Sequence, residues 1–323
     1  MGVEYFVNPQ TGSVNPVNGK KGTNGRKPTI HTKKLKAGMT KNLALPSSVD
    51  LRQYMTPVEE QGTKMNSCVA NALAGAVEYL MLRESGVHID VSRLFIFYNS
   101  RIIEEKTRHI DNTGVTIESG IKAIQKFGVC RESTWPYDPR LVNQEPSQKA
   151  FDEARRITIE PLQVQMDLDT MRECLAMGYP FCFGLKLFSS FQTVELNQGY
   201  IPMPEVTERL LNKKGYHAVL AVGYDDEEQH FIIRNSWGRK WGDQGYGYIP
   251  YSYMTNFQLV DPTDVFAITQ VTQRPLHERP WPKTNRHQPL YPAHRFYPVQ
   301  RYPVHAMFPI FPRVGFPILP YRI

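Results

Sequence analysis

The hydrophobic pattern of the chain changes near its middle, and this change limits the folds open to it. In the front half, apolar residues recur at three- and four-residue spacing, which is typical of helices, in segments 69–85, 91–106 and 116–128. The back half holds runs that favour strands, at 155–164, 179–187, 217–225, 230–237 and 245–251, with a hairpin turn at 225–229. This order predicts an α+β protein with a helical lobe (about 62–150), a β-rich lobe (about 155–274) and a cleft between them, where chemistry is usually found.

Charge is divided unevenly along the chain. Residues 1–45 carry eight Lys/Arg and one acid, residues 275–323 carry seven and one, and the body at 46–274 is left with −6 of a total of +7. Because residues 8–45 are rich in Gly, Asn, Pro, Thr and Lys without an apolar period, we interpret 1–45 as a basic mobile arm. Residues 275–323 hold 11 Pro among aromatic and Arg residues, which favours extended chain. This tail is expected either to wrap the body or to bind an acidic partner, a nucleic acid or a protein.

The spacing of the four cysteines indicates the redox compartment in which the protein is found. They form no CxxC pair, which fits a reducing compartment and argues against a metal site. No run of 18 apolar residues predicts a membrane span, and the first residues lack the apolar core of a secretory signal. The sequence therefore predicts a cytoplasmic protein with no cofactor. The cysteines are Cys68, Cys130, Cys174 and Cys182.

One cysteine lies where a helix start would activate it. Cys68 stands between a turn-prone segment and a helical pattern, and the positive end of a helix favours a thiolate. A single buried Cys is more often a core residue, as a single His or Asn is more often structural. However, a thiol nucleophile needs a base, and the base needs a group to orient it. His217 and Asn235 lie on two predicted strands joined by one short turn, so a hairpin can place them together.

At these residues the chain resembles the papain-like (cathepsin-like) cysteine peptidases, particularly their disulfide-poor bacterial and large-DNA-virus members. Four segments carry the resemblance, in the family's order: LPSSVDLRQYMTPVEEQG (45–62), NSCVANA (66–72), GYHAVLAVGYD (215–225) and RNSWGRKWGDQGYGYI (234–249). They cover most of the acidic body and neither end. The resemblance implies a two-lobe fold whose second lobe is antiparallel and barrel-like, hydrolysis of peptide or protein substrates, and a cytoplasmic or, for a virus, a virion setting.

The resemblance also implies roles for single residues. Cys68 is the nucleophile, His217 the base and then the acid, and Asn235 the residue that orients His217. Trp237 shields the pair and lines the leaving-group side, and Gln61 stabilises the oxyanion with the backbone N–H of Cys68, at about 3 kcal/mol of barrier for each donor. Position alone suggests three further substrate-binding residues, Gly114, Gly184 and Ala218.

The chain departs from the family pattern at three places. The segment from Gln61 to Cys68 is one residue longer than usual and lacks the usual second Cys. Val69 replaces a bulky aromatic residue, and the Gly-rich motif of the substrate groove is reduced to DNTG (111–114). Two other functions therefore stay open, a papain-like body that binds without cleaving and a Cys–His acyl transferase. Residues 1–45 stand where a propeptide would and are either a short inhibitory segment, which would make the chain a zymogen, or a solvated arm.

Overall fold

The computed structural model describes residues 4–8, 11–17, 19–36, 45–107, 110–211 and 216–274. These residues belong to one compact unit, Met1–Leu276. The predicted tail, 275–323, lies outside the described residues, so its expected role stays a prediction. No helix in the described part of the chain is long and apolar enough to cross a membrane.

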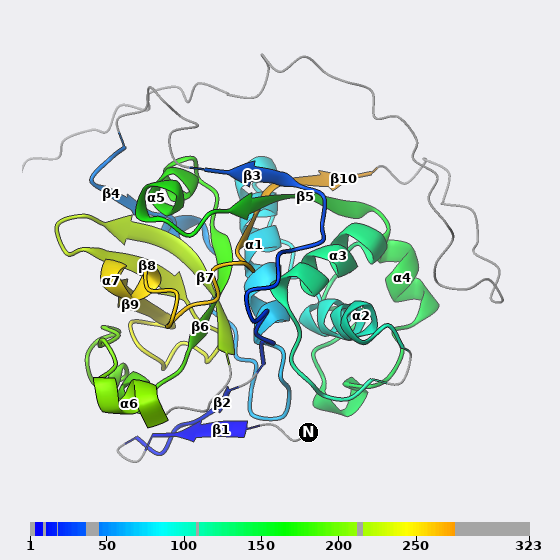
Figure 1. Ribbon diagram of the computed structural model, residues 1–323. Coiled ribbons are helices and arrows are strands. Elements are labelled where there is room, and N and C mark those ends of the chain that lie inside the picture. Colours follow the sequence, from blue (N-terminus) through cyan, green and yellow to red (C-terminus); the bar gives the residue numbers. More distant parts are fainter. Residues whose placement is uncertain are drawn as a thin grey trace, which may run out of the picture. The chain divides into compact units, whose positions relative to one another are not determined.

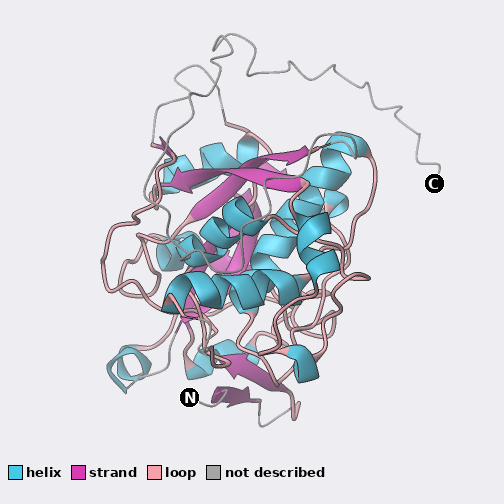
Figure 2. Cartoon of the chain, turned by 90° about the vertical axis from the view of Figure 1, so that its right-hand side faces the viewer, coloured by secondary structure: helices cyan, strands magenta, loops and turns pink. Residues whose placement is uncertain are grey.

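The helical side is built around α1 (Cys68–Ser85), whose first fourteen residues are all buried. α2 (Arg93–Glu105) and α3 (Ile117–Phe127) pack against it, and both begin at side-chain caps: Ser92 accepts from the N–H of Phe95, and Thr116 from that of Ser119. In Figure 2 these helices lie in front of the strands. The shorter helices are α4 (Gln148–Ala154), α5 (Leu168–Ala176), α6 (Val206–Leu211) and α7 (Tyr251–Met254).

An eight-stranded sheet forms the other side, in the order β3-β5-β10-β6-β7-β8-β9, with β4 paired to β7. Its strands run antiparallel except for β3, which is parallel to β5. Among the described residues the strand order is an open path from β3 to β9, so the lobe expected to be barrel-like does not close into a ring. The bounds are β3 (Lys33–Leu35), β4 (Ser48–Asp50), β5 (Ile157–Val164), β6 (Phe181–Lys186), β7 (Tyr216–Asp225), β8 (His230–Arg234), β9 (Tyr246–Pro250) and β10 (Phe266–Gln273).

Most predicted segments match the observed elements within a few residues. The three predicted helices are α1, α2 and α3, and the predicted hairpin is β7–β8 with its turn at 226–229. Strand β10 has no counterpart in the prediction. It completes the sheet between β5 and β6, and four of its last five residues (269–273) are polar, which weakens the apolar pattern in sequence.

The N-terminal segment, which is the part of the chain before residue 37, is ordered where the structure describes it and so differs from the expected mobile arm. Its described residues form a hairpin, β1 (Glu4–Val7) with β2 (Val14–Val17), and then β3 within the main sheet. Figure 1 shows this dark blue segment passing between the helices and the strands on its way from β2 to β3. The segment is ordered by a series of hydrogen bonds to side chains of the body. For example, the N–H groups of Thr29 and Ile30 donate to Glu118 (2.7 and 2.9 Å). The Gly/Asn-rich composition of the segment gives no sign of these bonds.

Candidate active site

Cys68 is the first residue of α1, and its side chain is fully buried. The backbone N–H of Ala218, on β7, donates to its Sγ at 3.4 Å, so the thiol bridges the two sides of the fold. Burial raises the pKa of this thiol to about 11, although the N–H groups of Ala218 and Val69 and the charge of Lys20 act in the opposite direction. In this arrangement Cys68 is a neutral thiol at pH 7.

His217 and Asn235 meet as the sequence predicts, since β7 carries one and the residue after β8 is the other. Nε2 of His217 and Oδ1 of Asn235 are 2.8 Å apart. The indole of Trp237 packs over the imidazole with ring centroids 4.7 Å apart. Nδ1 of His217 has no hydrogen-bond partner in the described part of the chain, which leaves it as the nitrogen able to take a proton from a thiol. Burial lowers the pKa of His217 to about 4, against the opposing effect of Asn235.

The longer segment before Cys68 is held at several points. The N–H of Gln61 donates to the carbonyl of Ser236 (2.8 Å), and the hydroxyl of Ser236 donates to Oε1 of Gln61 (2.6 Å). These bonds fix the amide so that Nε2 donates to the carbonyl of Met65 (3.2 Å) and keeps a second N–H for another acceptor. Asn112 anchors the middle of the segment by donating to the carbonyl of Lys64 (2.6 Å).

The N-terminal segment lies directly on this site. A Cβ added at Gly19 would be 2.5 Å from Sγ of Cys68, so the backbone of Gly19 covers the thiol. Directly after this contact the chain is hydrogen-bonded to both lobes. The N–H of Lys20 donates to the carbonyl of Tyr216 (3.2 Å), and that of Lys21 to the carbonyl of Val115 (2.9 Å).

Of the three residues suggested for substrate binding by position, Ala218 and Gly184 lie beside the N-terminal segment where it crosses the site. Ala218 contacts Cys68, as described above, and Gly184 pairs with Ala218 across β6 and β7. A Cβ at Gly184 would be 2.3 Å from the Lys20 side chain. Gly114 is buried and precedes Val115, whose backbone pairs with that of Lys20 in an isolated β-bridge.

Sequence reasoning missed three charged residues of the site: Lys20, Asp261 and Asp264. The Lys20 ammonium lies 2.8 Å from Asp261 and 3.0 Å from Asp264. The only local signal is the pair of carboxylates in DPTD (261–264), and nothing near Lys20 in sequence points to them.

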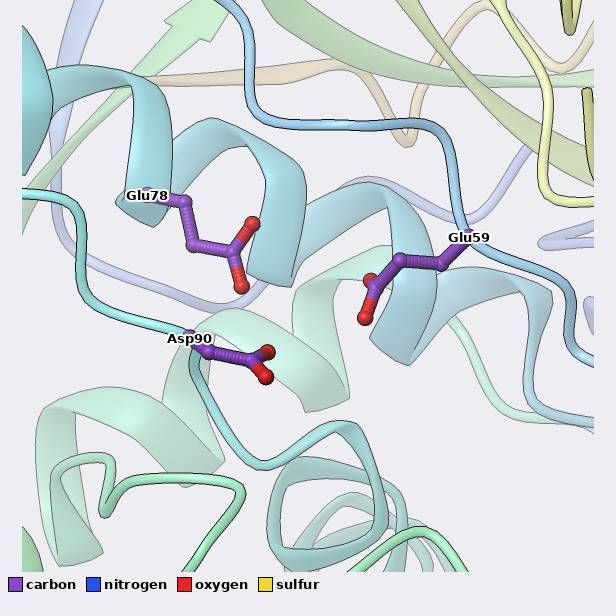
Figure 3. Close-up of side chains that lie close together, drawn as sticks. All are labelled: Glu59, Glu78 and Asp90. Carbon is purple, nitrogen blue, oxygen red and sulfur yellow. The ribbon is translucent and has the colours of Figure 1, made fainter.

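One further group of carboxylates resembles a cation site. Oxygens of Glu59, Glu78 and Asp90 lie within 4.8 Å of one another and point toward a common centre (Figure 3). Protein donors already engage them: Arg93 lies 2.9 Å from Glu59, and Glu78 accepts from the N–H of Val91 (2.8 Å). Burial raises the pKa of Glu59 to about 8, against the effect of Arg93. Because a protonated Glu59 is neutral, the three carboxyl groups carry less negative charge than their number suggests. We assign no metal to this group.

Comparison with known proteins identifies the family. A model of the papain family of cysteine proteases matches residues 45–259. The chain is 34% identical over 262 residues to an uncharacterised peptidase C1-like protein of Acanthamoeba polyphaga mimivirus, covering 76% of this chain and 81% of that protein. It is 30% identical over 217 residues to Peptidase 1 of Dermatophagoides pteronyssinus, covering 63% and 60%, so it spans less than two thirds of the mite protein.

Solved structures agree with this match. Xylellain, a cysteine protease from Xylella fastidiosa, superposes with a TM-score of 0.63 at 37% identity, over 79% of this chain and 98% of that one. Digestive procathepsin L 3 of Tenebrio molitor shares the fold with a TM-score of 0.59 at 21% identity, over 84% of each chain. The four motifs, the two-lobe α+β fold and these matches show that the chain belongs to the papain family of cysteine proteases and is a cysteine peptidase.

Proposed function

We propose that Cys68, His217 and Asn235 carry out peptide hydrolysis through an S-acyl enzyme. The observation that supports this most is the hydrogen bond between Asn235 and Nε2 of His217, because it leaves Nδ1 as the nitrogen for the thiol proton. Trp237 excludes water from that bond and lines the side of the leaving group. Gly114, Gly184 and Ala218 are proposed to contact the substrate backbone.

In the first half-reaction, Nδ1 of His217 takes the proton of Cys68, and the sulfur attacks the scissile carbonyl carbon. The oxyanion that forms accepts from the N–H of Cys68, at the positive end of α1, and from Nε2 of Gln61. The C–N bond then breaks, and the imidazolium gives its proton to the leaving amine. In the second half-reaction, Nδ1 takes a proton from water, the hydroxide attacks the thioester carbon, and the thiol regains a proton as the acid leaves.

We further propose that the N-terminal segment inhibits this reaction. Gly19 occupies the space over the sulfur that a scissile carbonyl needs, and burial under the segment disfavours both the thiolate and the imidazolium. Asn8 lies toward Trp237, since it donates to the carbonyl of Gln192 (2.6 Å) and Phe191 packs edge-on against Trp237 (5.7 Å). The segment therefore crosses from the leaving-group side to the opposite side.

An epoxide thiol trap tests both proposals. With the segment removed by a protease site inserted at 37–44, we expect rapid labelling of Cys68 and slow labelling of the three other cysteines, whose pKa values are also raised by burial. His217→Ala should abolish the selectivity. Equal labelling of all four cysteines would contradict an activated thiol, and equal rates before and after cutting would contradict inhibition.

The basic tail supports a separate proposal, that it binds an acidic partner. Seven Lys/Arg against one acid in residues 275–323 favour a nucleic acid or an acidic protein surface. We expect salt-sensitive association with DNA or RNA at low ionic strength that is lost on truncation at Arg274. Absence of association at low salt would contradict this proposal.

We also propose that the protein works in a reducing compartment, such as the cytoplasm or a virion. All four cysteines are free and buried, and a fold of this size is stable without disulfides. Thermal unfolding with and without a reductant should then give the same midpoint.

A further inference from the structure

The side chain of Lys20 is fully buried between two carboxylates. Its ammonium lies 2.8 Å from Asp261 and 3.0 Å from Asp264, and 5.2 Å from the ring centroid of Tyr216. Lysine is rarely buried to this degree unless it is paired. We call the surroundings of this side chain, formed by Asp261, Asp264, Gly184 and Tyr216, the Lys20 pocket.

The pocket is shaped for a long basic side chain. A Cβ at residue 184 would be 2.3 Å from both Cδ and Cε of Lys20, so the absence of a side chain at Gly184 makes room for the lysine stem in this position. The apolar stem therefore lies against bare backbone, while the carboxylates hold the charged end. Asp261 also accepts from the N–H and the hydroxyl of Thr23 (2.9 and 2.6 Å), so it loses three donors when the segment leaves.

Only part of this negative charge is balanced by the body itself. Asp264 accepts from the N–H groups of Ile117 and Glu118, both at 2.8 Å, at the start of α3. Asp261 accepts from Lys20 and Thr23 of the N-terminal segment and from the hydroxyl of Thr263, which belongs to the body and lies 3.2 Å away. Buried carboxylates without a cation are costly, so the empty pocket has a strong preference for a positively charged occupant.

The place of the pocket relative to Cys68 fixes which substrate residue enters it. Gly19 lies over the sulfur, and the next residue fills the pocket. His217 must reach the leaving amine, so the leaving group lies toward His217 and Trp237, and the pocket belongs to the acyl side. The residue there is the neighbour of the one whose carbonyl is attacked.

We propose that the Lys20 pocket is a specificity pocket, and that the enzyme prefers substrates with Lys or Arg as the second residue before the cleaved bond. Lys20 holds the place of that side chain while the N-terminal segment is bound. The preference rests on the proposed peptidase function, which supplies the cleaved bond. Asp261 is the residue that selects the charge, and Gly184 admits the stem.

The first experiment needs no cleavage. In the full chain, the rate at which iodoacetamide alkylates Cys68 reports how often the segment leaves. Replacing Lys20 by Met, which has a similar length and no charge, should raise this rate at least about tenfold, whereas Lys20→Arg should stay close to the parent. Equal or slower alkylation of the Lys20→Met chain would overturn the pocket's preference for a cation.

The second experiment uses peptides. Full-length Lys20→Glu places a carboxylate between Asp261 and Asp264 and so drives the segment out of the pocket. With fluorogenic peptides that differ only at the second residue before the cleaved bond, Lys and Arg should exceed norleucine in kcat/KM by at least about tenfold. Asp261→Asn in this background should bring the ratio toward one, and the exposed Asp169→Asn should leave the ratio intact.

The outcomes separate the two proposals. Cleavage without a basic preference, or with a basic preference at another position, overturns the pocket and leaves the peptidase function standing. Absence of cleavage of every peptide contradicts the peptidase function, and the alkylation rates still decide whether the pocket takes a cation. If Asp261→Asn does not fold, as thermal unfolding would show, the peptide comparison in Lys20→Glu alone decides.

Discussion

At the scale of single residues, one amide sets the roles of both ring nitrogens of His217. Without Asn235, Nε2 loses its partner at 2.8 Å, and the imidazole is free to turn and to change tautomer under Trp237. We expect Asn235→Ala to lower kcat/KM by about 100-fold, mostly through kcat. Asn197→Ala is the control, because that exposed amide bonds Thr193 and not the site. Unchanged kcat in Asn235→Ala would show that the indole alone holds the ring.

The residues proposed to be catalytic could be picked out from the sequence because each lies in its own short motif. Cys68 follows a turn and opens a helix, and one hairpin brings His217 and Asn235 together. Lys20 could not be predicted, since its partner Asp261 is 241 residues away and the composition around Lys20 indicates a solvated segment. A buried ion pair leaves no periodic pattern, so only the folded arrangement reveals it.

The pKa values of His217 and Cys68 predict how docking of the N-terminal segment over the site depends on pH. The pKa of His217 is about 4 under the segment and ordinarily near 6.5, so below pH 6.5 the open state binds more protons and docking weakens as pH falls. Burial also raises the pKa of Cys68 to about 11, so the uncovered thiol loses its proton more readily and docking weakens at high pH as well. We expect amide exchange of residues 19–23, corrected for intrinsic rates, to be faster at pH 5 than at pH 7.5, and His217→Ala to reduce the difference.

At the scale of elements, the start of α3 depends on a carboxylate from the other lobe. Asp264 accepts from two N–H groups of its first turn, in addition to the local cap from Thr116. Removing it leaves those buried donors without a charged acceptor, so Asp264→Ala should lower the free energy of unfolding by about 2 kcal/mol. Ser147→Ala, which removes the cap of α4, should cost about 1 kcal/mol in the same denaturation experiment. Equal losses would show that α3 needs only its local cap.

The segment that covers the site depends on one glycine. At Gly19 a Cβ would be 2.5 Å from the sulfur of Cys68 and 3.2 Å from the backbone of Asn66, and the backbone has little room to yield. We therefore expect Gly19→Ala to speed alkylation of Cys68 at least about tenfold, through weaker docking of the segment. Val14→Ala, on the exposed face of β2, is the control. Slower or equal alkylation of Gly19→Ala would mean that the segment shifts without leaving.

At the scale of the whole molecule, the N-terminal segment is both a part of the fold and a cover for the site. It adds β3 to the sheet edge and the ammonium of Lys20 to two buried carboxylates. The composition of the segment predicts neither, because its order comes from the body and not from its own residues. Stability and activity are therefore expected to change in opposite directions when it is lost.

A cut that frees residues 1–36 tests this opposition. Loss of the segment leaves Asp261 and Asp264 to repel each other with no cation between them, and it makes β5 an edge strand. The melting temperature should therefore fall by several degrees, which corresponds to about 1 to 2 kcal/mol in a domain of this size. Peptide cleavage should rise at the same time, because Cys68 is uncovered. A synthetic peptide of residues 15–27 should restore the melting temperature and inhibit cleavage, and the same peptide with Met in place of Lys20 should do both more weakly. A cut protein that melts lower but cleaves no faster would show that the segment stabilises the fold without controlling the site.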